Sequence, residues 1–268
     1  MCTSPHPTPG PIPPSDPKPR DWPNLVGSEP IHIHQIGPVS GVRAGPDSVR
    51  LVTTKTRLSG RVAWVADGTT ELGRAIAARL TAEGARVAAT APADLTDAIA
   101  ATHSRLVAEH GPIDLLINNV AADPAPVDVT GLADDELDRV MQLNFHTAVR
   151  CTRLVLPHLI ETGQGAVVNV AGPLAIQPWP RTSAVAAAQG ALLAWTRAAA
   201  AEVAPVGVRV NAIVPWQPGP QGALHMLPTP GTADDVAAAI AFLVSEDASF
   251  VTAATLYAEA GQLGIGVA

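Results

Sequence analysis

The sequence predicts a doubly wound α/β domain built on a parallel sheet, and three observations support that prediction. From residue 59 onward, short β-rich apolar runs alternate with longer segments of helical periodicity. Strand–helix alternation of this kind is typical of a parallel sheet with helices on both faces. The chain has 268 residues, 47% hydrophobic and 15% charged, which suits one such domain with a large core and an extension.

The extension occupies the N-terminal end and is expected to fall into two parts. Residues 1–30 contain ten prolines, a composition that cannot build a core, so we predict a disordered tail there. Residues 31–58 carry short apolar alternations between Gly-Pro breaks, which predicts an arm with one or two short strands. His32 and His34 have the spacing of a metal-binding pair, but no third ligand is near them, and we expect no metal site.

The first half of the domain, counted from residue 59, opens with a strand at 61–66, RVAWVA, followed by a turn. A helix is predicted at 71–84 because Leu72, Ile76 and Leu80 recur at spacing four, with Gly84 as its C-cap. A strand at 85–90 and a helix at 97–110, with Thr96 as a plausible N-cap, come next. A buried strand, DLLINN, occupies 114–119.

The second half continues the alternation. A long helix is predicted at 134–161, opened by acidic residues that suit a helix N-terminus. It is followed by the strand AVVNV at 166–170, a helix at 183–204 and the strand VRVNAIV at 208–214. A helix at 232–245 opens at Thr232, and TLYAEA at 255–260 is the last strand.

Charge, hydropathy and cysteine content exclude several classes of function. Residues 61–268 hold 11 Arg and 20 Asp or Glu, so the domain is acidic and lacks the basic stripe of a nucleic-acid-binding protein. No run of 18 apolar residues is present and no signal peptide is evident, so we expect no membrane span. The only cysteines, Cys2 and Cys151, fit a reducing compartment, and we expect a cytoplasmic protein.

The order of these segments resembles the short-chain dehydrogenase/reductase (SDR) family over about residues 59–263. The matching landmarks are a turn after the first strand, an Asn-Asn pair at 118–119, Asn144 in the long helix, RVNAIVP at 209–215 and the closing stretch 242–261. The resemblance implies a Rossmann-type sheet. In the family a glycine-rich turn holds NAD or NADP, and a Ser, a Tyr, a Lys and an Asn carry out catalysis.

The phosphate turn departs from the family pattern T-G-x-x-x-G-x-G. In the matching stretch Asp67 and Glu71 replace two glycines, and only Gly73 is retained. Glycine matters there because the backbone must approach a pyrophosphate closely at a helix N-terminus. We interpret Glu71 as capping its own helix and occupying the anion site, with retained dinucleotide binding as the alternative.

The adenosine and nicotinamide ends of the expected pocket are also changed. Only 23 residues (91–113) separate Thr90 from Asp114, too few for the helix, strand and helix that the family has there, so we predict that the third, edge strand and its helix are reduced or deleted. Asn118 is expected to hold the sheet together. Trp216 stands where the family has a glycine and would fill the space of the nicotinamide ring.

Three of the four catalytic positions carry residues that do not titrate. Gly172 stands at the Ser position, Val185 at the Tyr position and Gln189 at the Lys position, whereas Asn144 is retained. No substitute is available, because both lysines precede residue 60 and the only tyrosine, Tyr257, lies in the last strand.

These changes lead to three competing functions. The preferred one is a non-catalytic subunit that binds no cofactor and forms a homo-oligomer, or a hetero-oligomer with a catalytically intact SDR, through helices 134–161 and 183–204. The first alternative is a cofactor-free cyclase, dehydratase or lyase that uses the old pocket, with His146 and Ser183 as its candidate catalytic residues. The second is an oxidoreductase that uses NAD or NADP.

Overall fold

The computed structural model describes residues 56–95, 98–120, 125–216, 226–227 and 231–264. The chain divides into two units, Met1–Leu51 and Val52–Ala268, and all described residues belong to the second. The predicted tail and most of the predicted arm, including His32 and His34, lie outside the described residues. The described part already includes Leu58, which is buried at the edge of the domain core and whose backbone N–H donates to the carbonyl of Glu83.

A six-stranded parallel sheet forms the centre of the domain, as predicted. Its strand order is β2-β1-β3-β4-β5-β6, so the order reverses between β1 and β3. Ligands of open parallel sheets bind at such a reversal, outside the carboxyl ends of the strands. The strands are β1 (Val62–Ala66), β2 (Arg86–Thr90), β3 (Leu115–Asn118), β4 (Ala166–Val170), β5 (Arg209–Pro215) and β6 (Thr255–Ala258).

The predicted loss of the third, edge strand is confirmed. Only a short 3₁₀ turn, η1 (Pro92–Leu95), and one helix, α2 (Ile99–His110), are described between β2 and β3. As a result, β2 is the edge of the sheet on this side. The helix begins three residues after Thr96, with Ala98 as an N-cap that makes no side-chain bond, so the predicted start at residue 97 was wrong.

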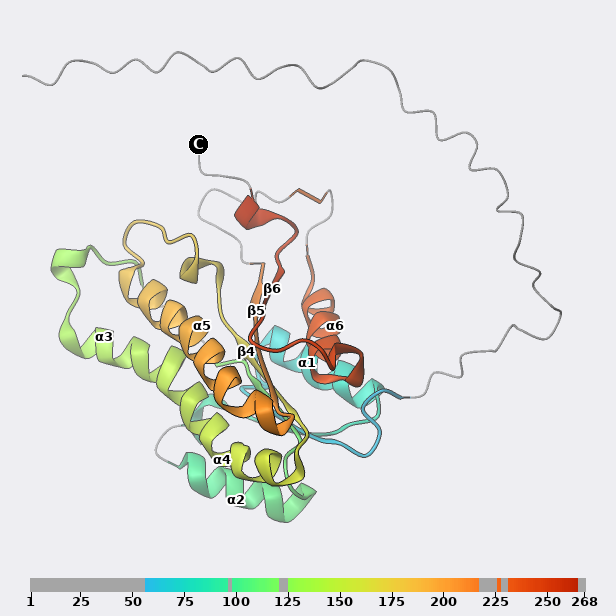
Figure 1. The fold of residues 1–268 in the computed structure, drawn as a ribbon. Coiled ribbons are helices and arrows are strands. Elements are labelled where there is room, and N and C mark those ends of the chain that lie inside the picture. The colour runs from blue at the N-terminus through green and yellow to red at the C-terminus, as the bar shows by residue number, and fades with distance from the viewer. Residues whose placement is uncertain (1–55, 96–97, 121–124, 217–225, 228–230, 265–268) are drawn as a thin grey trace, which may run out of the picture. The chain divides into compact units, whose positions relative to one another are not determined.

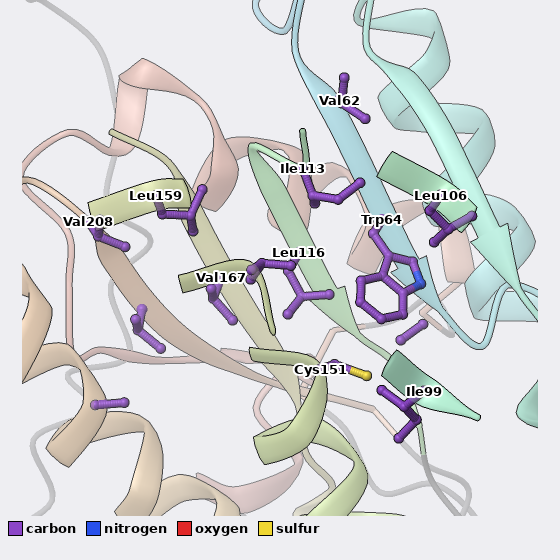
Figure 2. Packing of buried hydrophobic residues seen from close by; sticks show 14 of the residues in the cluster. Val62, Trp64, Ile99, Leu106, Ile113, Leu116, Cys151, Leu159, Val167 and Val208 are labelled. Atoms are coloured by element: carbon purple, nitrogen blue, oxygen red, sulfur yellow. The ribbon is translucent and has the colours of Figure 1, made fainter. Parts of the chain in front are cut away.

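Helices cover both faces of the sheet (Figure 1). One face packs against α1 (Glu71–Ala82) and α6 (Ala233–Val244), and the other against α2, α4 (Thr147–Thr162) and α5 (Ser183–Val203). On the second face Trp64 is fully buried beside Ile99 and Leu106 of α2 and Cys151 of α4 (Figure 2). The indole Nε1 of Trp64 donates to the hydroxyl of Thr90 at 3.1 Å, which satisfies its one polar atom.

The segment predicted as one long helix at 134–161 is interrupted by a π-helical turn. The helix α3 (Asp134–Met141) continues through the π turn η3 (Gln142–His146) into α4. Thr147 fixes the wider turn because both its N–H and its hydroxyl donate to the carbonyl of Gln142, five residues earlier. Such turns often lie at functional sites, and this one contains the retained Asn144. None of the described helices is long and apolar enough to cross a bilayer.

Candidate active site at the carboxyl edge of the sheet

The turn after β1 keeps an unusual backbone although its glycine is replaced. Asp67 adopts a left-handed conformation with a φ of 63° and is buried. Asp tolerates this region better than most residues because its short side chain bonds locally. Here the carboxylate Oδ1 of Asp67 accepts from the backbone N–H of Thr69 at 3.1 Å and from its hydroxyl at 2.7 Å.

Two glycines permit the close packing of this turn. A Cβ added at Gly73 would lie 2.3 Å from the carbonyl oxygen of Asp67, so only glycine lets α1 begin this close to the turn. A Cβ added at Gly68 would lie 2.6 Å from the Cβ of Ala89 on β2. The close packing of α1 against the turn is therefore preserved, whereas the position that approaches the pyrophosphate in the family carries Glu71.

The N-terminus of α1 is capped by Thr70, not by Glu71. The hydroxyl of Thr70 accepts from the N–H of Gly73 at 3.0 Å. Asn119, which follows β3, locks this arrangement because its Nδ2 donates to the carbonyl of Asp67 at 2.9 Å and to the Thr70 hydroxyl at 3.0 Å. Glu71 is the first helical residue and is exposed, so its predicted role as the cap was wrong.

The charges around the turn are mixed. Glu71 places an exposed carboxylate at the helix N-terminus, where the backbone N–H groups attract anions. The guanidinium of Arg74, one turn along, is exposed and donates to the carbonyl of Thr69. A bound pyrophosphate would therefore meet one repelling and one attracting group.

Asn118 lies in the interior of the sheet, where it ties four elements together. Its Nδ2 lies within hydrogen-bond distance of the carbonyl of Ala148, the hydroxyl of Thr152 and Oδ1 of Asn169. Asn169 in turn donates to the hydroxyl of Thr196 on α5 at 2.9 Å. These bonds link β3, β4, α4 and α5 behind the site, the arrangement that a structural role for Asn118 requires.

Gly172 and Gln189, which stand at the family's Ser and Lys positions, lie next to each other. Gly172 follows β4, and Gln189 is 5% exposed on the inner face of α5. A Cβ added at Gly172 would lie 2.6 Å from Oε1 and 2.8 Å from Nε2 of Gln189. The carboxamide of Gln189 therefore fills the space that a side chain at residue 172 would need.

Two polar side-chain atoms of α5 lack hydrogen-bond partners in the described part of the chain. They are Oε1 of Gln189 and Oγ of Ser183, both buried. A buried acceptor or hydroxyl without a partner costs about 1–3 kcal/mol, and native proteins keep few of them. An ordered water or a bound ligand supplies the missing bonds at such atoms.

The other sequence-predicted residues divide between buried and exposed positions. Val185 packs in an apolar cluster with Val140, Leu174 and neighbouring residues of α5, so the Tyr position is filled by packing. Asn144 is buried, and its Nδ2 donates to the carbonyl of Val140 at 3.0 Å. His146 is exposed, with its ring against that of Phe145, and the structure does not bring it to the buried group.

Cys151 does not provide an alternative nucleophile. Burial raises the pKa of its thiol to about 12, so the thiolate is scarce at neutral pH. Among the described residues, no group of three His, Cys, Asp or Glu side chains is placed to hold a metal ion.

Trp216 follows β5 and lines a cavity of about 580 Å³ beyond it. Its backbone N–H donates to the carbonyl of Ala258 at the end of β6. The cavity lies between the ends of β5 and β6 and the first turn of α6, and sequence reasoning missed it. The sequence signal that could have drawn attention to it is the absence of Lys and Arg after Arg209. This segment supplies all of the described residues that line the cavity.

Comparison with known proteins assigns the domain to a family. The model of the short chain dehydrogenase family matches residues 59–218. The chain is 30% identical over 243 residues to the 2-dehydro-3-deoxy-L-rhamnonate dehydrogenase (NAD(+)) of a Sphingomonas species, covering 77% of this chain and 96% of that protein. It is 29% identical to the levodione reductase of Leifsonia aquatica, covering 77% of this chain and 96% of the reductase.

Solved structures agree with this assignment. A short-chain dehydrogenase/reductase from Burkholderia xenovorans superposes with a TM-score of 0.72 at 30% identity, covering 79% of this chain and 99% of that one. The aldohexose dehydrogenase of Thermoplasma acidophilum superposes with a TM-score of 0.73, covering 80% and 98% of the two chains. At 24% identity it shows likeness of fold alone.

Two expectations from the sequence are corrected by these findings. The preferred function, a non-catalytic subunit, is contradicted because the relatives are named as dehydrogenases and reductases. The expectation that no cofactor binds is contradicted because the family is one of nicotinamide-dependent enzymes and one relative carries NAD(+) in its name. The physical reason lies in the turn, because Asp67 adopts a left-handed conformation of the kind that glycine favours and Gly73 lets α1 pack closely against it.

Proposed function

The chain belongs to the short-chain dehydrogenase/reductase family, and from that premise we propose that it is an oxidoreductase that uses NAD or NADP. The observation that carries the proposal is the buried Oε1 of Gln189, which lacks a hydrogen-bond partner among the described residues at the position of the family's lysine. Of the three functions that the sequence left open, this one is also supported by the names of the relatives.

The backbone of the turn after β1 fits a dinucleotide, whereas the negative charge of Glu71 opposes its binding. The turn from Asp67 to Gly73, clamped by Asn119, would hold the pyrophosphate on the N–H groups that open α1. Oε1 of Gln189 would accept from a ribose hydroxyl, in place of the family's lysine. The exposed carboxylate of Glu71 weakens this site without blocking it, because the side chain is free to turn toward solvent.

The nicotinamide ring, when bound, supplies or accepts a hydride. The residues at the family's Ser, Tyr and Lys positions cannot protonate a substrate, because Gly172, Val185 and Gln189 do not titrate. We therefore propose hydride transfer without the Tyr–Lys pair. The proposed chemistry relies on positioning and desolvation, which can supply a large part of a barrier reduction without acid–base groups.

We also propose that the protein forms oligomers through α4 and α5 and lies in the cytoplasm. Alanines at 187, 194, 198 and 201 form an exposed strip along α5, which permits close approach of a second helix. The cytoplasmic location rests on the low cysteine content and on the free thiol of Cys151.

Calorimetric titration of the full chain with NADH and with NADPH tests the proposed function. We expect one of them to bind with a dissociation constant in the micromolar to submillimolar range. Gly73→Ala should abolish the binding, because its Cβ would collide with the Asp67 carbonyl and displace the turn.

Gly190→Ala is the matched control, since a Cβ there meets its nearest atom only at 4.0 Å. Circular dichroism of each variant verifies that the fold persists. If neither dinucleotide binds to the folded wild-type chain, and neither binds to a Glu71→Gln variant, the proposal is overturned.

A further inference from the structure

The cavity beyond β5 has apolar and aromatic walls. Trp216 and Tyr257 provide the rings, and Met226 and Leu227 line the cavity although they are 62% and 58% exposed. Large apolar side chains that remain exposed around a hollow typically mark a binding surface. The cavity is large enough for a small organic molecule.

Among the described residues, the charged groups that line this cavity are all acidic. Asp235 and Glu259 line it, together with no Lys, Arg or His among the described residues. From residue 210 to residue 268 the sequence holds five Asp or Glu residues and no Lys or Arg. The described lining therefore combines aromatic rings with two carboxylates and no cationic side chain.

Glu259 gives the strongest indication of a cationic ligand, because its side chain carries a carboxylate and the residue is only 7% exposed. Its Oε2 accepts from the backbone N–H of Leu263 at 2.8 Å, and no cationic side chain lies among the described residues that share the cavity with it. Burying a carboxylate is costly unless a cation or several hydrogen bonds compensate it. One backbone hydrogen bond compensates it only in part.

Asp235 also remains ionised at neutral pH. Hydrogen bonds from the hydroxyl and backbone N–H of Thr232 to its Oδ2 lower the pKa of its carboxyl. These bonds belong to the capping box of α6, and they fix the side chain at the cavity wall.

We propose that this cavity binds an organic cation, an ammonium or iminium group carried on an apolar body. The carboxylate of Glu259 provides the counter-charge, the rings of Trp216 and Tyr257 provide cation–π attraction, and Met226 and Leu227 contact the apolar body. An anionic ligand is repelled by both carboxylates, and a neutral one leaves Glu259 uncompensated.

The same ligand class suits the proposed oxidoreductase function, on which this step rests. A carbonyl that accepts a hydride becomes an alkoxide and requires a proton, for which the catalytic positions have no donor. An iminium differs: the new C–H bond forms at its carbon, the π pair of the C=N bond becomes the nitrogen lone pair, and the product is a neutral amine. The reduced nicotinamide is oxidised, the iminium is reduced and no proton is transferred.

The position of the cavity agrees with this role. Trp216 follows β5, the strand next to β4, whose carboxyl end leads to Gly172. Both places lie at the same edge of the sheet, where parallel sheets bind their substrates. The proposed substrate class is therefore an iminium ion, or in the reverse direction the amine from which it forms.

Calorimetric titration of the full chain, without any dinucleotide, tests the cavity alone. The probes are N-methyl-3,4-dihydroisoquinolinium and 3-methyl-1,2-dihydronaphthalene, a cation and a neutral molecule of nearly equal shape. We expect the cation to bind at least about tenfold more tightly than the neutral probe, and Glu259→Gln to remove most of that preference. Glutamine keeps the bond from Leu263, so the variant is expected to fold.

The matched control is Asp234→Asn. Asp234 is an exposed acid next to Asp235 in the first turn of α6, but it does not line the cavity. Equal affinity for the two probes, or an unchanged cation affinity in Glu259→Gln, would overturn the cavity proposal. Cation binding without dinucleotide binding would leave the cavity proposal in place and overturn the oxidoreductase function instead.

A second experiment tests the substrate class. With NADH or NADPH present, we expect the isoquinolinium probe to be reduced and the ketone 2-tetralone to be reduced at least about a hundredfold more slowly. Reduction of both at similar rates would overturn the assignment of an iminium substrate, while the calorimetric result would still report on the cavity.

Discussion

Gly172 and Gln189 depend on each other, because the carboxamide of Gln189 occupies the space beside the Gly172 backbone. We predict that Gly172→Ser, which restores the family's residue, destabilises the domain by about 1–3 kcal/mol through overpacking. Chemical denaturation measures this change. The double variant Gly172→Ser/Gln189→Ala should recover most of it, and a single variant as stable as the wild type would contradict the steric coupling.

Glu71 provides a second test at the residue scale, because its exposed carboxylate lies where the helix dipole favours a bound anion. We predict that Glu71→Gln tightens dinucleotide binding by about three- to tenfold, since it removes roughly 1 kcal/mol of repulsion. The gain should shrink in high salt, which screens exposed charges. Titration at low and high ionic strength measures both effects, and an equal gain at both would rule out electrostatics as the cause.

At the scale of elements, an ion-pair group joins the start of the domain to the end of α1. The Arg57 guanidinium donates to Glu83 and, at 3.0 Å, to Asp247, while Arg79 donates to Glu83 at 2.7 Å. The hydrogen bond from Arg57 holds the pKa of the Glu83 carboxyl below its ordinary value of 4.5, and Arg79 adds to the effect.

This group predicts an acid-dependent contribution to stability. Because the folded pKa of Glu83 lies below the unfolded one, its stabilisation is present above about pH 4.5 and is lost as the pH falls through the folded value. Glu83→Gln should cost about 1 kcal/mol at neutral pH and flatten the stability profile below pH 5. Thermal denaturation from pH 3 to 7 measures it, with the exposed Glu109→Gln as the control that should change little.

At the scale of the whole molecule, the sequence predicted the architecture better than the site. Alternation and spacing sufficed for the six strands, and the 23 residues after Thr90 sufficed for the missing edge strand. The site depends on contacts between distant residues, such as Gln189 against Gly172 and Asn119 against the turn. Periodicity carries no information about these contacts. The turn itself was misjudged because Asp67 supplies both the left-handed backbone and its own local bonds.

The surface of α5 leads to the last prediction, which concerns assembly. Ala194 and Ala198 are exposed on this helix, one turn apart, in the strip of alanines that also includes 187 and 201. Small side chains allow two helices to approach closely, and Arg at both positions would force them apart. We predict that light scattering after size exclusion finds the wild type as a dimer or larger and the double variant Ala194→Arg/Ala198→Arg as a monomer.

The same substitution at Ala78, exposed on α1 over the opposite face of the sheet, is the control for added charge. Because Ala194 and Ala198 are already exposed in the single chain, their replacement should leave the fold and its thermal unfolding nearly unchanged. A loss of assembly with an intact fold therefore assigns the interface to α5. A monomeric wild type, or an unchanged assembly in the double variant, would show that these alanines face solvent in the working protein.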